Sequence, residues 1–214
     1  MPQAALGTRV SRSRKKKGHG LACRQSGFTL TELVVAMGIG LILMAVALPS
    51  FLRAYYSYQL SHAASQAADI VRLTRYEAIR RNKPMRCVFQ PDALNPGMTD
   101  AFMTDTSGAA LTGVAAMTVQ LGASGNLVDA GTVTGAAALP AAANLGPTAP
   151  ATVPASGVTL QFDARGALST GNVTVFYLQS AAAPDAGYRA VLLTPAGSLE
   201  IWTADITGNW RQVR

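Results

Sequence analysis

An apolar run from Phe28 to Leu52 constrains this 214-residue chain more than any other feature. Glu32 is the only charged residue in it, and about 20 consecutive apolar residues in a helix can cross the hydrocarbon core of a bilayer. The run therefore predicts a single membrane-spanning helix. A carboxylate inside such a segment costs on the order of 2.5 to 3.5 kcal/mol near the helix centre. Because of this cost, we expect Glu32 to have a partner.

The segment before the apolar run is strongly basic. Residues 1–27 hold seven of the eighteen basic residues and no acidic residue, so the formal net charge of +7 belongs to them alone. A basic patch such as Arg12 to Lys17 is compatible with nucleic-acid binding. Beside a membrane span it more simply places this end in the cytoplasm. An ordinary secretory signal would be cut after its apolar region rather than before it.

The stretch from Gly27 to Leu33, Gly-Phe-Thr-Leu-Thr-Glu-Leu, resembles the N-terminus of type IV pilins and of the pseudopilins of type II secretion. In that family a prepilin peptidase cuts after the glycine, and the new N-terminal residue is N-methylated. The resemblance implies cleavage between Gly27 and Phe28, with methylation of Phe28. Residues 1–27 would then be a cleaved leader. The assembly glutamate and the helix-weakening proline of the family fall on Glu32 and Pro49.

The physical properties of Glu32 agree with this resemblance. After cleavage, the Phe28 amine would lie about 6 Å from Glu32 along the helix axis. In the family the glutamate pairs with the amine of a neighbouring subunit, which sets the axial stagger of the filament. Opposite charges attract more strongly when they are desolvated. The alternative is an ordinary signal anchor that carries a stray acid.

The helix is predicted to continue past Leu52 as far as Asn82-Lys83-Pro84, with residues 28–52 in the membrane and residues 53–83 in the periplasm. Apolar and small residues recur at intervals of three and four, which is the period of an amphipathic helix. The stripe consists of Leu60, Ala64, Ala67, Val71, Thr74 and Ala78. The segment from Leu73 to Asn82 resembles the GspH and FimT branch of the pilin family.

Other side chains on and after this helix have two interpretations each. Arg72, Arg75, Arg80 and Arg81 could form a binding face for an acidic partner or nucleic acid. A solvated helix face with Glu77 among them is favoured, since cations suit a helix C-terminus. His62 is interpreted as a surface or packing residue rather than a metal ligand. Cys87 is the only cysteine after Gly27 and is predicted to be a buried small side chain.

Residues 84–214 are predicted to form a β-rich globular domain. Short β-branched or aromatic runs are bounded by Gly, Pro, Asn and Asp. We assign strands to 85–90, 117–121, 158–162, 173–179, 188–194 and 198–203, with turns at Asp163 to Gly166 and at Thr194 to Ser198. These elements indicate an α+β fold in which the long N-terminal helix packs on a small antiparallel β-sheet domain.

A segment from Ala130 to Gly157 interrupts these strands and is dominated by Ala, Gly, Thr and Pro. Its plainest parts are Leu139-Pro140-Ala141-Ala142-Ala143 and Pro147-Thr148-Ala149-Pro150. Such a composition offers little to bury, which predicts a mobile surface loop. A tolerated insertion is favoured over a partner-binding role.

No catalytic or cofactor-binding motif is present in the sequence. Asp100 and Asp105 stand among Thr and Met without the ligand density of a calcium loop. We therefore expect no catalytic residues, no metal and no cofactor.

The C-terminal tail carries one binding hypothesis. It reads Gly208-Asn209-Trp210-Arg211-Gln212-Val213-Arg214, and DNA-binding FimT-like minor pilins carry a Gly-Arg-x-Arg element near this place, although Asn209 departs from its first arginine. Arg211 and Arg214 could neutralise phosphates and Trp210 could stack on a base. A packing role for Trp210 is the alternative.

The resemblance as a whole implies a minor pilin or pseudopilin of the GspH/FimT kind, near the filament tip. It would be a single-pass inner-membrane protein with a periplasmic domain, later incorporated into a pilus or pseudopilus. The implied partners are the prepilin peptidase, other pilins through the helix, the inner-membrane assembly platform and membrane lipid. A type IV pilus and a type II secretion system both remain open, as does DNA binding for natural transformation.

Overall fold

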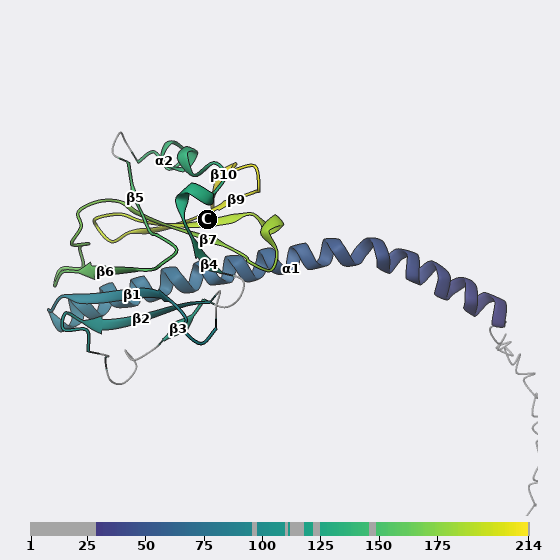
Figure 1. The fold of residues 1–214 in the computed structure, drawn as a ribbon, viewed down its shortest axis with the longest axis horizontal. Coiled ribbons are helices and arrows are strands. Elements are labelled where there is room, and N and C mark those ends of the chain that lie inside the picture. Colours follow the sequence, from purple (N-terminus) through teal and green to yellow (C-terminus); the bar gives the residue numbers. More distant parts are fainter. Residues whose placement is uncertain are drawn as a thin grey trace, which may run out of the picture. The chain divides into compact units, whose positions relative to one another are not determined.

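The computed structural model describes residues 29–95, 98–109, 111, 118–121, 125–145 and 149–213. Gly27, Phe28 and Arg214 lie outside the described residues. The chain divides between Leu43 and Met44 into two compact units. A long N-terminal helix and antiparallel sheets make up the fold (Figure 1), so the predicted α+β class is confirmed.

Helix α1 spans Leu30–Arg81, and local signals define both of its ends. The Thr29 hydroxyl accepts a hydrogen bond from the Glu32 backbone N–H at 3.2 Å, which satisfies one of the free donors at the helix start. Asn82 adopts a φ of 50°, and the following Lys83-Pro84 cannot continue the helix. The predicted stop at Asn82-Lys83-Pro84 is therefore confirmed.

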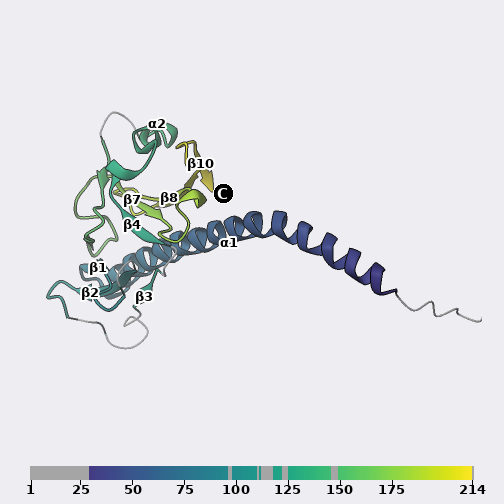
Figure 2. The same cartoon turned by 45° about the vertical axis from the view of Figure 1, so that its right-hand side comes forward.

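The second half of helix α1 supplies one wall of the main core. All six residues of the predicted stripe are buried, together with other mostly small residues on the same side: Ala63, Ala68 and Ile70. In both ribbon views this half runs between β1 and β2 on one side and β4 and β7 on the other (Figures 1 and 2). Small side chains on the helix allow the strands to approach it closely.

The domain holds two sheets rather than the one small antiparallel sheet that we predicted. The first has the order β3 (Val119–Gln120), β2 (Thr99–Asp105), β1 (Met85–Pro91), β6 (Val158–Phe162). The second has the order β10 (Trp210–Val213), β9 (Leu199–Ala204), β8 (Tyr188–Leu193), β7 (Thr174–Gln179), β4 (Asn126–Val128), and β5 (Ala151–Thr152) adds a parallel pair on β7.

Strands β2 and β10 were not predicted, because their sequences are too polar. Strand β2 reads Thr-Asp-Ala-Phe-Met-Thr-Asp, yet it pairs along its whole length with β1. The predicted strands at 158–162, 173–179, 188–194 and 198–203 agree with β6 to β9 within one residue at each end. The predicted turns are also present, since Gly166 N–H donates to the Asp163 carbonyl and Gly197 N–H to the Thr194 carbonyl.

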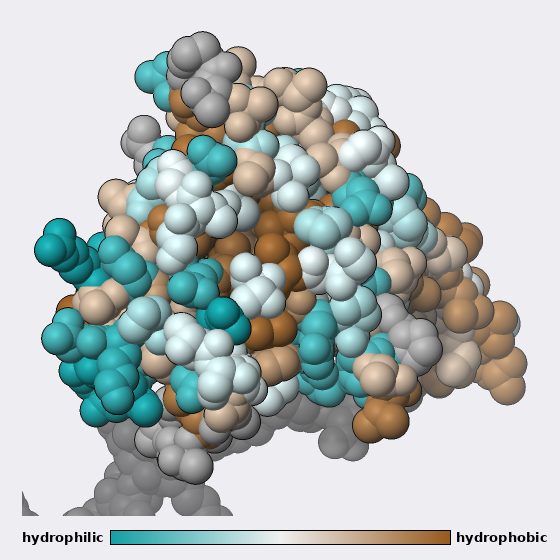
Figure 3. Space-filling model, turned by 60° about the vertical axis from the view of Figure 1, so that its left-hand side comes forward, coloured by the Kyte–Doolittle hydropathy of each residue, from teal (hydrophilic) through white to brown (hydrophobic). Residues whose placement is uncertain are grey.

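The main core lies between helix α1 and the two sheets. Its largest buried side chains include Phe89 from β1, Phe162 from β6 and Phe176 from β7. Cys87 is fully buried among them as predicted, and burial raises the pKa of its thiol to about 12. On the face shown in Figure 3, polar residues surround a hollow with apolar atoms at its floor.

A second core covers the other face of the β10-to-β4 sheet, and the Ala-rich segment forms its outer layer. This segment folds into the 3₁₀ turns η2 (Ala130–Thr132) and η3 (Ala136–Ala138) and the short helix α2 (Leu139–Ala142). It buries Val133 and Leu139 against the sheet residues Val175, Tyr177, Tyr188, Ala190, Leu192, Trp202 and Ala204. The expectation that this segment has little to bury is therefore wrong, because Val133 and Leu139 are both buried in this core.

The Ala-rich segment is also held by hydrogen bonds and by a close backbone contact. The Tyr177 hydroxyl donates to the Ala136 carbonyl at 3.3 Å, and the Trp210 indole N–H donates to the Gly135 carbonyl at 2.8 Å. A Cβ on Gly135, whose φ is 73°, would lie 2.7 Å from the Gly208 Cα. Only glycine fits this approach, so the segment and the C-terminal tail are packed as one piece.

Candidate functional site

The first half of helix α1 exposes apolar side chains on all of its faces. Leu41 and Ile42 are each 69% exposed and Val46 is 75% exposed, and no residue of the apolar stretch is buried. A helix that is apolar all round must be covered by lipid or by other apolar helices. By length and composition this helix can cross a membrane, and its exposed surface can also serve for helix association.

Glu32 lies in the first turn of this helix and is exposed. Its backbone is capped by Thr29, but within the part of the chain that the structure describes its carboxylate has no hydrogen-bond or ion-pair partner. Acidic side chains are favoured near the positive end of the helix dipole. An unpartnered carboxylate surrounded by exposed apolar side chains is suited to pairing with a cation from another molecule.

Pro49 lies inside helix α1 without interrupting it. Proline has no N–H, so the Ala45 carbonyl, four residues earlier, loses its usual helical donor. That Pro49 weakens the helix, as the resemblance implies, stays a prediction. Glu32 and Pro49 are on the same helix, about four to five turns apart.

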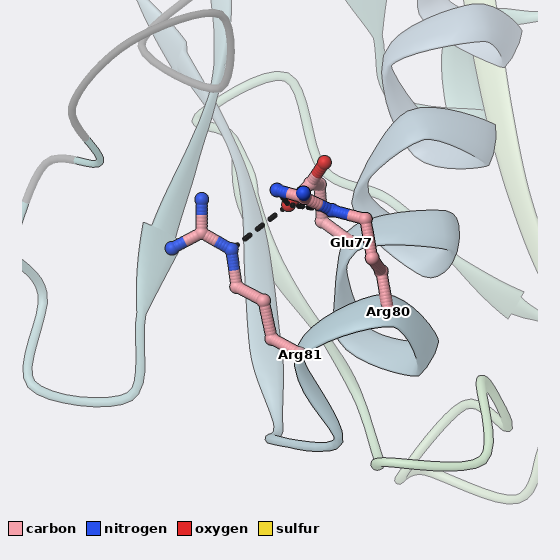
Figure 4. Close-up of polar contacts among 3 residues, drawn as sticks. All are labelled: Glu77, Arg80 and Arg81. Atoms are coloured by element: carbon pink, nitrogen blue, oxygen red, sulfur yellow. Dashed lines mark hydrogen bonds and ion pairs between the residues drawn. The ribbon is translucent and has the colours of Figure 1, made fainter.

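Three of the four arginines in the second half of helix α1 pair with carboxylates on the same helix. Arg80 and Arg81 both donate to Glu77 Oε2 at 2.8 Å (Figure 4). The hydrogen bond from Arg80, and then that from Arg81, holds the pKa of the Glu77 carboxyl below its usual range. Arg72 pairs with Asp69 at 3.0 Å on the surface.

The environment of Arg75 differs from the prediction that it lies on a solvated helix face. Arg75 is half-buried, and it donates from Nε to the Gly166 carbonyl at 3.0 Å and from Nη1 to the Gly197 carbonyl at 3.2 Å. These are the two turns that the sequence predicts. Arg75 therefore fixes both turns to the helix, and we assign it a structural role.

In the C-terminal tail, Trp210 and Arg211 have different environments. The Trp210 ring packs on Tyr177 with centroids 5.8 Å apart, and its N–H is taken by the Gly135 carbonyl. These contacts favour the packing role over stacking on a base. Arg211 is exposed on β10 and lines a cleft of about 280 Å³ together with Arg189. The DNA-binding hypothesis assigns Trp210 and Arg211 to one binding element, but in the structure Trp210 packs in the domain while Arg211 is exposed.

Asp205 organises the turn before the tail. Its carboxylate accepts hydrogen bonds from the Thr207 hydroxyl and backbone and from the Asn209 backbone and side chain. These donors, the Thr207 hydroxyl first, hold the pKa of Asp205 well below its usual range. The spacing Asp-x-Thr-Gly-Asn is a sequence signal for such a turn.

Replacing Asp205 with asparagine is expected to lower the thermal unfolding midpoint at pH 7, because the variant loses charge-assisted hydrogen bonds. Since the folded pKa is depressed, this contribution is fully present above the unfolded value of about 4 and is lost as pH falls below it. Unfolding curves of both proteins between pH 7 and pH 2 should therefore converge at the acidic end. A gap that stays constant with pH would contradict the role of the Asp205 charge.

Metal binding gains no support among the described residues, where no group of three or more His, Cys, Asp or Glu side chains comes together. His62 is exposed on helix α1. Asp105 accepts hydrogen bonds from the Ser107 hydroxyl and backbone and from the Ala109 backbone, and so closes the turn after β2.

These features are typical of a membrane-anchored subunit: a small two-sheet domain on a long helix whose exposed, apolar first half can span a membrane and carries one acidic residue. Comparison with family models identifies the prokaryotic N-terminal methylation motif at residues 23–48. The family described as type II transport protein GspH matches residues 63–197, which is more than half of the chain. The chain therefore belongs to the GspH family of type IV pilin-like proteins. Comparisons with curated proteins and with solved structures gave no match.

Membership of this family confirms the resemblance noted in the sequence. The chain is a minor pilin or pseudopilin, a structural subunit of a non-enzymatic family. Its methylation motif and apolar helix are those of a pilin anchored in the inner membrane, which is processed by a prepilin peptidase and interacts with other pilins.

Proposed function

We propose that this protein is cut between Gly27 and Phe28, methylated at Phe28 and then built into a filament near its tip through helix α1. The observation that supports the proposal is the exposed carboxylate of Glu32, which has no partner among the described residues and lies in the first turn of a helix whose first half is apolar on all sides. The match to the methylation motif at residues 23–48 spans Gly27, Phe28 and Glu32, which supports the proposal. In this arrangement Glu32 binds the Phe28 amine of a neighbouring subunit, and Pro49 lets the helix adapt as it leaves the bilayer.

The membrane arrangement follows from the charges around the helix. Residues 1–27 hold the basic excess, which keeps the leader in the cytoplasm. The domain that follows helix α1 is then periplasmic. Tyr55 and Tyr58, both exposed, lie just past the apolar segment, where aromatic residues suit the membrane interface. The assembly platform in the inner membrane would receive the subunit from this position.

Gene deletion tests which machine uses the subunit. One strain set is scored for pilus-dependent motility, for DNA uptake and for export of secreted hydrolases. We expect loss of hydrolase export with motility and uptake unchanged, as for the type II transport system that the description of the matching family names. Loss of motility or uptake alone would contradict this and place the subunit in a type IV pilus. Complementation with the unaltered gene is the control.

DNA binding is a second candidate function, and the exposed position of Arg211 beside Arg189 favours it. Phosphate contacts from arginine give binding that weakens steeply with salt. If deletion abolishes uptake, the variant with Arg211 and Arg214 both replaced by alanine should bind duplex DNA more weakly. Unchanged affinity, measured by fluorescence anisotropy at two salt concentrations, would remove this candidate.

A further inference from the structure

The cleft beside the C-terminal tail is built around a buried arginine. It has a volume of about 280 Å³, and its lining residues include Ser57 from helix α1, Arg189 from β8, Thr203 from β9 and Arg211 from β10. Arg189 is only 6% exposed. A guanidinium is always charged at physiological pH, so this cleft has a fixed positive charge in its wall.

Arg189 is held by neutral groups alone. Its Nε donates to Ser61 Oγ at 3.0 Å, Nη1 to the Tyr188 carbonyl at 2.9 Å, and Nη2 to Ser57 Oγ at 2.8 Å and to the Ser57 carbonyl at 3.3 Å. Among the described residues no carboxylate forms an ion pair with it. Burial without a counter-ion lowers its pKa from the usual value. A buried charge of this kind is costly until an opposite charge reaches it.

A second guanidinium stands in the same row of the sheet. Arg189 on β8 is directly opposite Thr203 on β9, and Thr203 is directly opposite Arg211 on β10. Residues directly opposite one another project from the same face of a sheet. Arg189 and Arg211 thus flank the Thr203 hydroxyl on the face that packs toward helix α1, with Arg189 buried and Arg211 exposed.

Asp205 also lines the cleft, but it does not supply the missing counter-ion. Both of its oxygens accept hydrogen bonds from its own turn. Oδ1 accepts from the Thr207 hydroxyl and from the Thr207 and Asn209 backbone N–H groups, and Oδ2 accepts from the Asn209 side-chain amide. The negative charge of Asp205 instead affects which anion can bind. Two arginines and one aspartate give the cleft a formal net charge of about +1, which suits a singly charged anion better than a doubly charged phosphate.

We propose that this cleft binds the carboxylate of an acidic side chain from a neighbouring subunit. Arg189 and Arg211 would bind the carboxylate, and Thr203 lies between them as a hydroxyl donor. The choice of a polypeptide partner rests on the proposed function, because a filament subunit has other pilins packed along its helix, and Ser57 in the cleft wall belongs to that helix. The binding chemistry itself can be measured on the isolated protein.

The test uses the full mature chain in detergent with ¹⁵N-labelled arginine. The Nε–H of Arg189, protected by its hydrogen bond to Ser61, is followed by NMR and assigned with Arg189→Lys. The probes are acetyl-Gly-Glu-Gly-amide, its Gln counterpart and inorganic phosphate. We expect the Glu peptide to shift this signal saturably and to bind about ten-fold more tightly than the Gln peptide, which is typical of one charge-assisted hydrogen bond.

Arg211→Gln is the informative variant, because Arg211 is exposed and its loss leaves the tether from Arg189 to helix α1 intact. It should weaken the Glu peptide about ten-fold. Arg72→Gln, an exposed arginine outside the cleft, is the matched control and should leave binding unchanged. Equal binding of the Glu and Gln peptides, no shift with any probe, or tighter binding of phosphate would each overturn the proposal, the last in favour of a nucleic-acid backbone.

A failure here is distinguishable from a failure of the proposed function. The peptide measurement needs no filament, whereas incorporation into filaments depends on helix α1 and Glu32. If the protein is incorporated into filaments normally but does not bind the Glu peptide, only the proposed carboxylate site in the cleft is overturned.

Discussion

Replacing Glu32 with alanine is expected to remove this subunit from filaments while leaving it inserted and processed. The substitution makes the apolar segment still more apolar, so insertion is not impaired. It also leaves the Phe28 amine of the neighbouring subunit without a partner in a medium of low dielectric constant. Breaking a buried pair from one side costs about 3 to 5 kcal/mol, so incorporation should fall on the order of 100-fold or more.

Quantitative immunoblotting of sheared filaments against the membrane fraction measures incorporation, and mass spectrometry of the N-terminus measures cleavage and methylation. Glu32→Asp should restore part of the incorporation, while Glu32→Gln should not. Thr31→Ala is the matched control, since it changes the adjacent exposed residue without altering charge. Normal incorporation of the alanine variant would contradict the pairing of Glu32 with an amine.

Replacing Leu139 with alanine is expected to destabilise the domain by about 2 to 5 kcal/mol, the usual range for a buried leucine. Leu139 is fully buried on the outer face of the β10-to-β4 sheet, although it lies in the most alanine-rich part of the chain. For a chain of this size the unfolding midpoint should fall by roughly 5 to 15 °C. Thermal unfolding followed by near-ultraviolet circular dichroism would also report on Tyr177 and Trp210.

Leu94→Ala is the matched control for this measurement. Leu94 is 89% exposed, and its hydrogen bond to Asp92 uses the backbone N–H, which the substitution keeps. Its midpoint should remain within about 1 °C of the unaltered protein, as is usual for a surface substitution. If Leu139→Ala behaves like Leu94→Ala, the Ala-rich segment does not contribute a core in solution.

The membrane helix and its continuation could be predicted from the sequence because two strong periodic signals mark them. The run from Phe28 to Leu52 is long and almost free of charge, and the stripe from Leu60 to Ala78 has the period of a helix. The central strands were found for a similar reason, since β7 and β8 are buried on both faces and read as continuous apolar runs.

The layering of the domain could not be predicted, because it depends on contacts between distant residues. The Ala-rich segment has few large side chains, and only the fold shows that Val133 and Leu139 both face the sheet. Arg189 was missed as a candidate site residue. A single charge inside the apolar run Tyr188–Leu193 was the available signal, since a charged residue in a strand buried on both faces requires polar partners.

Two arginines attach helix α1 to the rest of the domain at separate positions along the helix axis. Arg189 contacts the helix at Ser57 and Ser61, and Arg75 reaches from the helix to the turns at Gly166 and Gly197, about five turns further along. A force applied along the helix axis would therefore load both attachments at once, together with the alanine face between them. Bonds loaded in parallel must break together, so the domain should resist pulling along the helix better than peeling from one end. A subunit that is drawn out of a bilayer by its helix is loaded in the direction in which these attachments act together.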